Sequence, residues 1–456
     1  MSPTRFESED FDATPLAQPL HFEFSGKTAK TPFLKGAMTE RMSSWSPTEL
    51  EKRGVPSAEL VNVYKRWGEG GFGVVLSGNV MIEYDHLESA GNAIIPQGAP
   101  FEGERFERFK AMAEATKKHG SLAVMQVSHP GRQVMADIQK NPISASDIQL
   151  EANFAGRTFA KPRAMEKKDI ERVIEGFAYA AEYASKAGWD GVQIHGAHGY
   201  LLAQFLSPVT NRRTDDYGGS LANRSRLILE IADAIRARVP KDFSLSIKIN
   251  SVEFEEHGFS SDDCVLLCSE LEKHGFDFVE LSGGTYQQFG FIHRRESTRK
   301  REAFFLEFAE KIIPELKKTK VYVTGGFRTG AAMANALKST HGIGLGRPAA
   351  HEFDLPQKLI DGRAKAAIKV LLPEDDFGMT SLASGMQFRL VGKDKEPVDL
   401  SREDHKQAFE DSFGKWGMSM ADNKDGAKYE GIDLVGVELQ PYGTPYPAAT
   451  MGDSKI

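Results

Sequence analysis

Two histidines and a tyrosine stand close together in the sequence, in a position suited to acid–base chemistry. His195, His198 and Tyr200 follow the apolar run 192–194, which has the length of a β-strand. Imidazole and phenol groups donate hydrogen bonds and can transfer protons. At the C-terminal end of a strand, such donors lie where a parallel α/β barrel carries its active site. We therefore take these residues as candidate catalytic and substrate-binding residues.

The histidine pair is open to three interpretations. Zinc ligation is disfavoured because neither a third ligand nor an H-E-x-x-H motif accompanies the pair, so we expect no metal. The other two interpretations are packed structural histidines and a pair of donors that holds a substrate oxygen. The residues described below favour the donor pair.

The elements that must position these side chains alternate between strand and helix patterns. Eight strand candidates and eight helix candidates predict an α/β protein, a (β/α)8 TIM barrel with a short N-terminal cap and a C-terminal extension. The predicted strands are 33–38, 73–80, 122–127, 191–195, 245–250, 278–281, 321–324 and 342–345. The predicted helices are 57–68, 104–119, 166–186, 221–238, 260–274, 303–317, 329–337 and 355–361.

The alternation also divides the chain into three parts. Residues 1–31 are predicted to be an extended lead-in with a cap strand at 21–24, and residues 32–363 the barrel. Residues 364–456 fall outside the alternation, and their segment 391–430 is charged and turn-rich with few periodic runs. We expect this last part to be an extension, partly irregular, that packs on the barrel.

A lysine is predicted to face the interior of the barrel. In the fifth strand, period-two alternation directs Ser246, Lys248 and Asn250 inward. Burying a lysine costs several kcal/mol, to order of magnitude, unless an anionic group meets it. A salt bridge to a neighbouring carboxylate is one solution, and an anionic ligand in the barrel is the other.

Two glycine loops predict a phosphate site. Gly325 and Gly326 follow the seventh predicted strand, and Gly346 and Arg347 follow the eighth. Glycines let backbone N–H groups approach an anion, and an arginine can add a bidentate fork. Barrel phosphate sites form from the loops after strands seven and eight. No G-x-G-x-x-G follows an early strand, so a dinucleotide fingerprint is not present.

The segment 207–224 carries a longer pattern, S-P-x-x-N-x-R-x-D-x-Y-G-G-S-x-x-N-R. This pattern resembles the signature of the Old Yellow Enzyme family of FMN-dependent oxidoreductases. It departs from that signature at Ala222, where the family usually has Glu. The resemblance, with matched motifs in several strands, covers residues 20–362 and implies a non-covalent FMN with its phosphate on the two glycine loops.

The resemblance also implies contacts to the flavin ring from the ends of four strands. These residues are Ala37, Met38, Thr39, Asn79, Gln126 and Lys248. Thr39 stands where one branch of the family has Cys, and Asn79 stands where Gly or Ala is usual. Family members more often carry Arg at this last position. Lys248 supplies the same positive charge without the bidentate fork of an arginine.

For activity, the resemblance implies ping-pong reduction of an electron-poor alkene, with NADPH or NADH as the reductant. His195 and His198 would hold the oxygen of an α,β-unsaturated carbonyl or nitro compound. A hydride from flavin N5 would reach the β-carbon, and Tyr200 would give a proton to the α-carbon. The alternatives are a member specialised for one metabolite and a flavin-binding protein with little catalysis. Long iron–sulfur members are excluded, because two cysteines cannot hold such a cluster.

Bulk properties restrict the partners and the compartment. A formal net charge of −7 argues against nucleic acid, and no apolar run is long enough for a membrane span. Two cysteines and an N-terminus without an apolar core favour the cytoplasm. The terminal Ser-Lys-Ile differs by one aliphatic residue from a peroxisomal address, so a peroxisomal location stays open. We expect a small-molecule substrate and leave a homodimer open.

Overall fold

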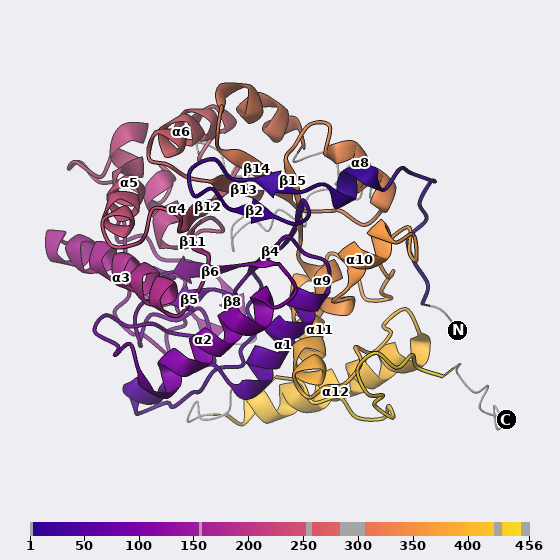
Figure 1. Ribbon diagram of the computed structural model, residues 1–456. Coiled ribbons are helices and arrows are strands. Elements are labelled where there is room, and N and C mark those ends of the chain that lie inside the picture. The colour runs from indigo at the N-terminus through magenta and orange to yellow at the C-terminus, as the bar shows by residue number, and fades with distance from the viewer. Residues whose placement is uncertain (1–2, 155–156, 252–257, 283–305, 424–430, 448–456) are drawn as a thin grey trace.

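The computed structural model describes residues 3–154, 157–251, 258–282, 306–423 and 431–447 (Figure 1). Eight parallel strands of its central sheet close into a barrel, because strand β11 pairs with both β12 and β6. The strands are β3 (Phe33–Lys35), β4 (Val74–Leu76), β6 (Leu122–Ser128), β11 (Gly191–Gly196), β12 (Ser244–Asn250), β13 (Phe278–Ser282), β14 (Lys320–Thr324) and β15 (Gly342–Leu345). The predicted (β/α)8 fold is confirmed.

Two strands differ from the prediction by more than one residue. The first strand ends at Lys35 instead of residue 38, so residues 37–39 belong to the loop at the barrel mouth. The predicted second strand, 73–80, is divided into β4 and a short β5 (Val80–Met81), which pairs with β6. Both differences place candidate flavin contacts in loops, where backbone groups are not used by a strand ladder.

The helices surround the barrel, as Figure 1 shows. They are α1 (Ala58–Glu69), α2 (Gly103–Lys117), α3 (Lys167–Lys186), α5 (Leu221–Arg236), α6 (Ser261–Lys273), residues 306–312, α8 (Gly330–Ala336), α9 (Arg347–His351) and α10 (Leu355–Ile360). Helix α1 illustrates why they form: Ser57 caps its first turn, and Leu60, Val63 and Trp67 recur at helical spacing on its buried face. Among the described residues, no helix is long and apolar enough to cross a membrane.

A hairpin covers the N-terminal end of the barrel. Of the expected cap strand at 21–24, only His21 lies in a strand: the hairpin strands are β1 (Leu20–His21) and β2 (Thr28–Ala29), and residues 22–24 lead into the turn between them. Phe22 stacks on Phe278 at 5.3 Å and packs into the apolar cluster at this end of the barrel. The barrel is therefore closed at this end, and its opposite end carries the candidate site.

The C-terminal part is more regular than its composition indicated. Segment 391–430 has few periodic runs in its sequence, yet α12 runs through Glu403–Ala421 after α11 (Phe377–Gly392). Phe388 of α11 meets Trp67 of α1 at 5.3 Å between ring centroids, and the two rings join the barrel core. The tail 454–456, with the Ser-Lys-Ile sequence, lies outside the described residues.

Candidate functional site

The predicted histidine–tyrosine group is brought together at the C-terminal end of β11. His195 lies in the buried strand, and His198 takes a left-handed backbone conformation (φ 59°) in the turn that follows. The side chain of Asn250, at the end of β12, accepts a hydrogen bond from the His198 backbone N–H at 3.2 Å. Tyr200 precedes α4 (Leu201–Leu206), with its ring centroid 4.5 Å from that of His195. The turn thus places both imidazoles and the phenol side by side.

The two imidazoles are part of a hydrogen-bonded chain across the barrel mouth. Ser128 Oγ lies 3.2 Å from His195 Nδ1, and His195 Nε2 lies 3.2 Å from His198 Nδ1. His198 Nε2 lies 3.0 Å from Ser282 Oγ. A neutral imidazole has one N–H and one lone pair, so all protons in this chain must point the same way. The tautomers of the two histidines are therefore coupled, and the two serines, which the sequence analysis did not select, end the chain with hydroxyls that can donate or accept.

Both imidazoles are neutral at physiological pH. Burial, followed by the charge of Lys248, lowers the pKa of His198 to about 3. Burial also lowers the pKa of His195 well below its usual value, with smaller effects from His198 and Lys248. Neutral N–H groups can still donate hydrogen bonds to an oxygen. The pair is thus suited to hold a carbonyl or nitro oxygen without a change of charge.

We predict that neither imidazole titrates between about pH 5 and 8, where an ordinary histidine would. Because the pKa of His198 is lower in the folded protein than in the unfolded chain, the unfolded chain takes up a proton first as the pH falls. The contribution of neutral His198 to the free energy of unfolding is therefore complete above the unfolded pKa of about 6.5. It is lost as the pH falls toward the folded pKa. Imidazole nitrogen shifts from NMR, assigned with His198→Ala, should stay flat over this range. A titration midpoint near about 6.5 would contradict the assigned environment.

A polar layer inside the barrel joins the predicted ring contacts. Lys248 Nζ donates to Glu280 Oε1 at 2.8 Å, and Thr324 Oγ1 donates to the same oxygen at 2.7 Å. Gln193 Nε2 donates to Glu280 Oε2 at 2.9 Å, and Gln126 Nε2 donates to Gln193 Oε1 at 2.7 Å. Lys248 thus forms the salt bridge to a neighbouring carboxylate that was one of the two interpretations of a buried lysine. Its role at a flavin stays a prediction.

Glu280 and Gln193 were missed, although the sequence carried a signal for both. Glu280 pairs in register with Lys248 across β12 and β13, and Gln193 pairs with Gln126 across β11 and β6. The period-two argument that directed Lys248 inward applies equally to these neighbouring strands. Applied to all eight strands, it would have identified the whole polar layer.

The loop after β3 meets the loop after β4. Thr39 Oγ1 donates to Asn79 Oδ1 at 3.2 Å, and Asn92 Nδ2 lies 3.4 Å from the same oxygen. Ala37 and Met38 beside it are half-buried. Asn79, whose role the sequence left open, therefore orients the Thr39 hydroxyl, and the resemblance places Thr39 next to the flavin.

The two predicted phosphate loops are adjacent, since β14 and β15 pair in the sheet. Gly326 has φ 77°, a conformation that favours glycine, and both Gly325 and Gly326 are half-buried at the mouth. Gly346 has open space where a Cβ would be. Arg347, which was predicted to add an anion fork, donates from Nη1 to the Glu374 carbonyl at 2.9 Å. The C-terminal extension thus holds one nitrogen of this arginine.

A second group of titratable residues lies beyond β5 and β6. His86 Nδ1 is 2.8 Å and His129 Nε2 is 3.3 Å from Glu83 Oε2, and Arg172 pairs with the same carboxylate. The Gly131 N–H donates to His129 Nδ1 at 3.0 Å, so neutral His129 carries its proton on Nε2. A protonated nitrogen is not a metal ligand. The hydrogen bonds therefore favour a structural network at this position.

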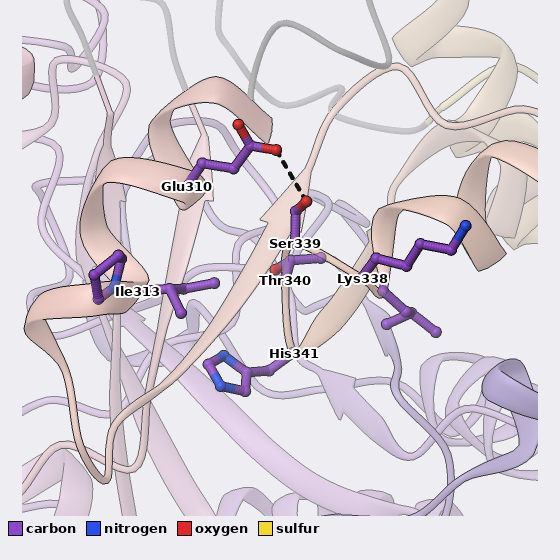
Figure 2. A pocket seen from close by; sticks show the side chains of 8 residues that line it. Glu310, Ile313, Lys338, Ser339, Thr340 and His341 are labelled. Carbon is purple, nitrogen blue, oxygen red and sulfur yellow. Dashed lines mark hydrogen bonds between the residues drawn. The ribbon is translucent and has the colours of Figure 1, made fainter.

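A separate cavity of about 430 Å³ lies at the other end of the barrel (Figure 2). Its lining residues precede β14 and β15, and Glu310 accepts a hydrogen bond from Ser339 there at 2.9 Å. The lining consists of Glu310, Ile313, Pro314, Leu337, Lys338, Ser339, Thr340 and His341. None of the predicted site residues contributes to it, so this cavity is not the candidate site.

Comparisons with known proteins agree with the barrel and identify the family. A family model described as NADH:flavin oxidoreductase / NADH oxidase family matches residues 19–366. The NADH-dependent flavin oxidoreductase nadA of Aspergillus parasiticus is 46% identical over 407 residues, which are 89% of this chain and 92% of that protein. The 12-oxophytodienoate reductase 1 of Oryza sativa subsp. japonica is 39% identical over 186 residues, 39% of this chain and 48% of that protein. An Old Yellow Enzyme homologue from Zymomonas mobilis has the same fold, with a TM-score of 0.64 at 22% identity over 77% of this chain and 94% of that structure.

Proposed function

Because the chain belongs to the NADH:flavin oxidoreductase / NADH oxidase family, we propose that it reduces the activated C=C bond of α,β-unsaturated carbonyl or nitro compounds. It is a flavin oxidoreductase of the Old Yellow Enzyme type that uses FMN and NAD(P)H. The observation that carries the proposal is the pair of neutral, hydrogen-bonded imidazoles with a phenol beside them at the barrel mouth. The rice relative is named for a substrate that combines an oxo group with C=C bonds, which supports the same substrate class.

The residues at the mouth fit an FMN. Amide and hydroxyl groups of Gln126 and Thr39 offer the donors and acceptors that a flavin ring requires, and Lys248 supplies a cation in the barrel interior. The half-buried glycines 325 and 326 suit the phosphate end. When bound, FMN takes a hydride from NAD(P)H and supplies it to the alkene.

The protein's own residues would prepare the alkene for that hydride. The N–H groups of His195 and His198 would turn from their partners in the hydrogen-bonded chain to the substrate oxygen. Each such hydrogen bond contributes about 0.5–1.5 kcal/mol net, and more as negative charge develops on the oxygen. Polarising the oxygen makes the β-carbon electrophilic, and Tyr200 would then protonate the α-carbon as a general acid.

The proposal is tested by anaerobic NADPH and NADH oxidation over a panel of enones, maleimides and nitroalkenes. Turnover with several panel members is the expected result. A protein that binds FMN but turns over none of them would instead be a flavin-binding protein with little catalysis. Turnover of a single compound class would indicate a member specialised for one metabolite.

We predict that each chain carries one FMN held without a covalent bond. The contacts that support it are hydrogen bonds and charges, and no cysteine lies at the mouth, since Cys264 and Cys268 are buried in α6. Heat denaturation should release a yellow compound that chromatographs as FMN. Colour that remains on the precipitated protein, or FAD in the supernatant, would refute the prediction.

A further inference from the structure

Glu280 is the centre of the polar layer inside the barrel. Its side chain is 0% exposed and accepts hydrogen bonds from three side chains on three other strands. Two of those donors, Lys248 at 2.8 Å and Thr324 at 2.7 Å, share Oε1. Gln193 occupies Oε2 and in turn accepts from Gln126. The carboxylate therefore connects residues of β6, β11, β12, β13 and β14 at one level of the barrel.

The position of Glu280 in β13 explains why it reaches this layer. Side chains alternate along a strand, so Phe278, Glu280 and Ser282 all face the barrel interior. Phe278 packs in the apolar cluster at the closed end, and Ser282 reaches His198 at the mouth. Glu280 lies between the two, directly below the hydrogen-bonded chain of the histidines.

A buried carboxylate is stable only when its charge is compensated. Here the Lys248 ammonium balances it, so the pair adds no net charge to the layer. A plain structural salt bridge would satisfy the same requirement. However, the partners of Glu280 include Lys248 directly and Gln126 through Gln193, and both are proposed flavin contacts. Its charge therefore acts at the place where the charge of a bound flavin changes on reduction.

We propose that Glu280 is a positioning residue and counter-charge that lowers the reduction potential of the bound flavin by offsetting Lys248. This inference rests on the proposed function. A lone cation beside the ring would favour the anionic reduced form, whereas a neutralised one favours it less. Removing the carboxylate should thus raise the midpoint potential, and removing the ammonium should lower it.

The test compares midpoint potentials of the FMN-loaded protein, measured at pH 8 against a reference dye, for wild type, Glu280→Gln, Lys248→Met and the double variant. Glu280→Gln should favour the reduced form at least about tenfold, which is about 30 mV for a two-electron couple. Lys248→Met should shift the equilibrium in the opposite direction. The double variant should return close to wild type, because the compensated pair has been replaced by two neutral groups.

Asp190→Asn is the matched control. Asp190 is also a buried, ion-paired carboxylate, 3.1 Å from Lys117, but it lies at the closed end of the barrel. Its removal should leave the potential unchanged, which separates a local charge effect from general destabilisation. FMN occupancy is measured for every variant from the flavin-to-protein absorbance ratio, so that potentials are compared only at full loading.

An unchanged potential in fully loaded Glu280→Gln would overturn the inference and leave Glu280 a structural residue. If that variant does not fold, the double variant carries the test, since a neutral pair in place of a buried ion pair is usually tolerated. The midpoint potential of the double variant must then be higher than that of Lys248→Met. Equal midpoint potentials of these two variants would overturn the inference. A wild-type protein that binds no FMN would refute the proposed function instead.

Discussion

Replacing Tyr200 by phenylalanine is expected to slow the oxidation of the reduced enzyme by 2-cyclohexenone by about a hundredfold or more. The Tyr200 ring packs 4.5 Å from the His195 ring, and phenylalanine keeps this packing while it removes the acidic proton. Reduction of the enzyme by NADPH requires no acid, so that step should stay within a small factor of wild type. Nitroalkenes should be less affected, because a nitronate is stable enough to be protonated in water.

Stopped-flow measurement of the two half-reactions separates these effects. Tyr183→Phe is the matched control, because the buried Tyr183 hydroxyl on α3 has no hydrogen-bond partner among the described residues. It should leave both half-reactions unchanged. If Tyr200→Phe slows both half-reactions alike, Tyr200 is a structural residue; if it slows neither, another group is the acid.

Replacing either histidine by alanine should weaken the binding of phenolic ligands, which such sites hold as phenolates. Each imidazole would contribute one N–H to the phenolate oxygen, and a charge-assisted hydrogen bond of this kind is worth about 1–3 kcal/mol. His195→Ala and His198→Ala should thus each raise the dissociation constant of p-hydroxybenzaldehyde by about 5- to 150-fold. Each imidazole has a serine partner, Ser128 for His195 and Ser282 for His198, so neither substitution is expected to be silent.

Titration with p-hydroxybenzaldehyde measures this loss through a long-wavelength charge-transfer band in the FMN-loaded protein. His341→Ala is a suitable control, because His341 lines the cavity at the other end of the barrel. Bands of equal strength and midpoint in wild type and both site variants would mean that the pair faces away from the flavin.

The barrel could be predicted from the sequence because short apolar runs alternate with segments of helical periodicity along the chain. Strand β15 lies where the pattern placed it, and α3 and α5 differ from their predicted ranges only at the ends. Local signals of this kind determine where an element begins and ends. They also directed Lys248 inward, because alternation is a property of a single strand.

The partners of these residues depend on contacts between distant segments, and single-strand patterns do not contain them. The Glu280 carboxylate meets Lys248 because β12 and β13 pair in one particular register. Arg347 is held by Glu374 because α11 packs against α9 and α1, which no periodicity indicated. The hydrogen-bonded chain that couples the tautomers of His195 and His198 likewise ends on serines from two other strands. Candidate site residues could thus be chosen one by one from the sequence, but the hydrogen bonds that connect them could not be predicted.

The most direct test of the central claim is product analysis of an anaerobic reaction of the FMN-loaded protein with NADPH and 2-cyclohexenone. The account predicts that cyclohexanone forms in equal amount to the NADPH consumed, with the carbonyl intact. It also predicts that the double substitution His195→Ala and His198→Ala abolishes this product while FMN remains bound. Consumption of NADPH without cyclohexanone, or reduction of the carbonyl to an alcohol, would contradict it.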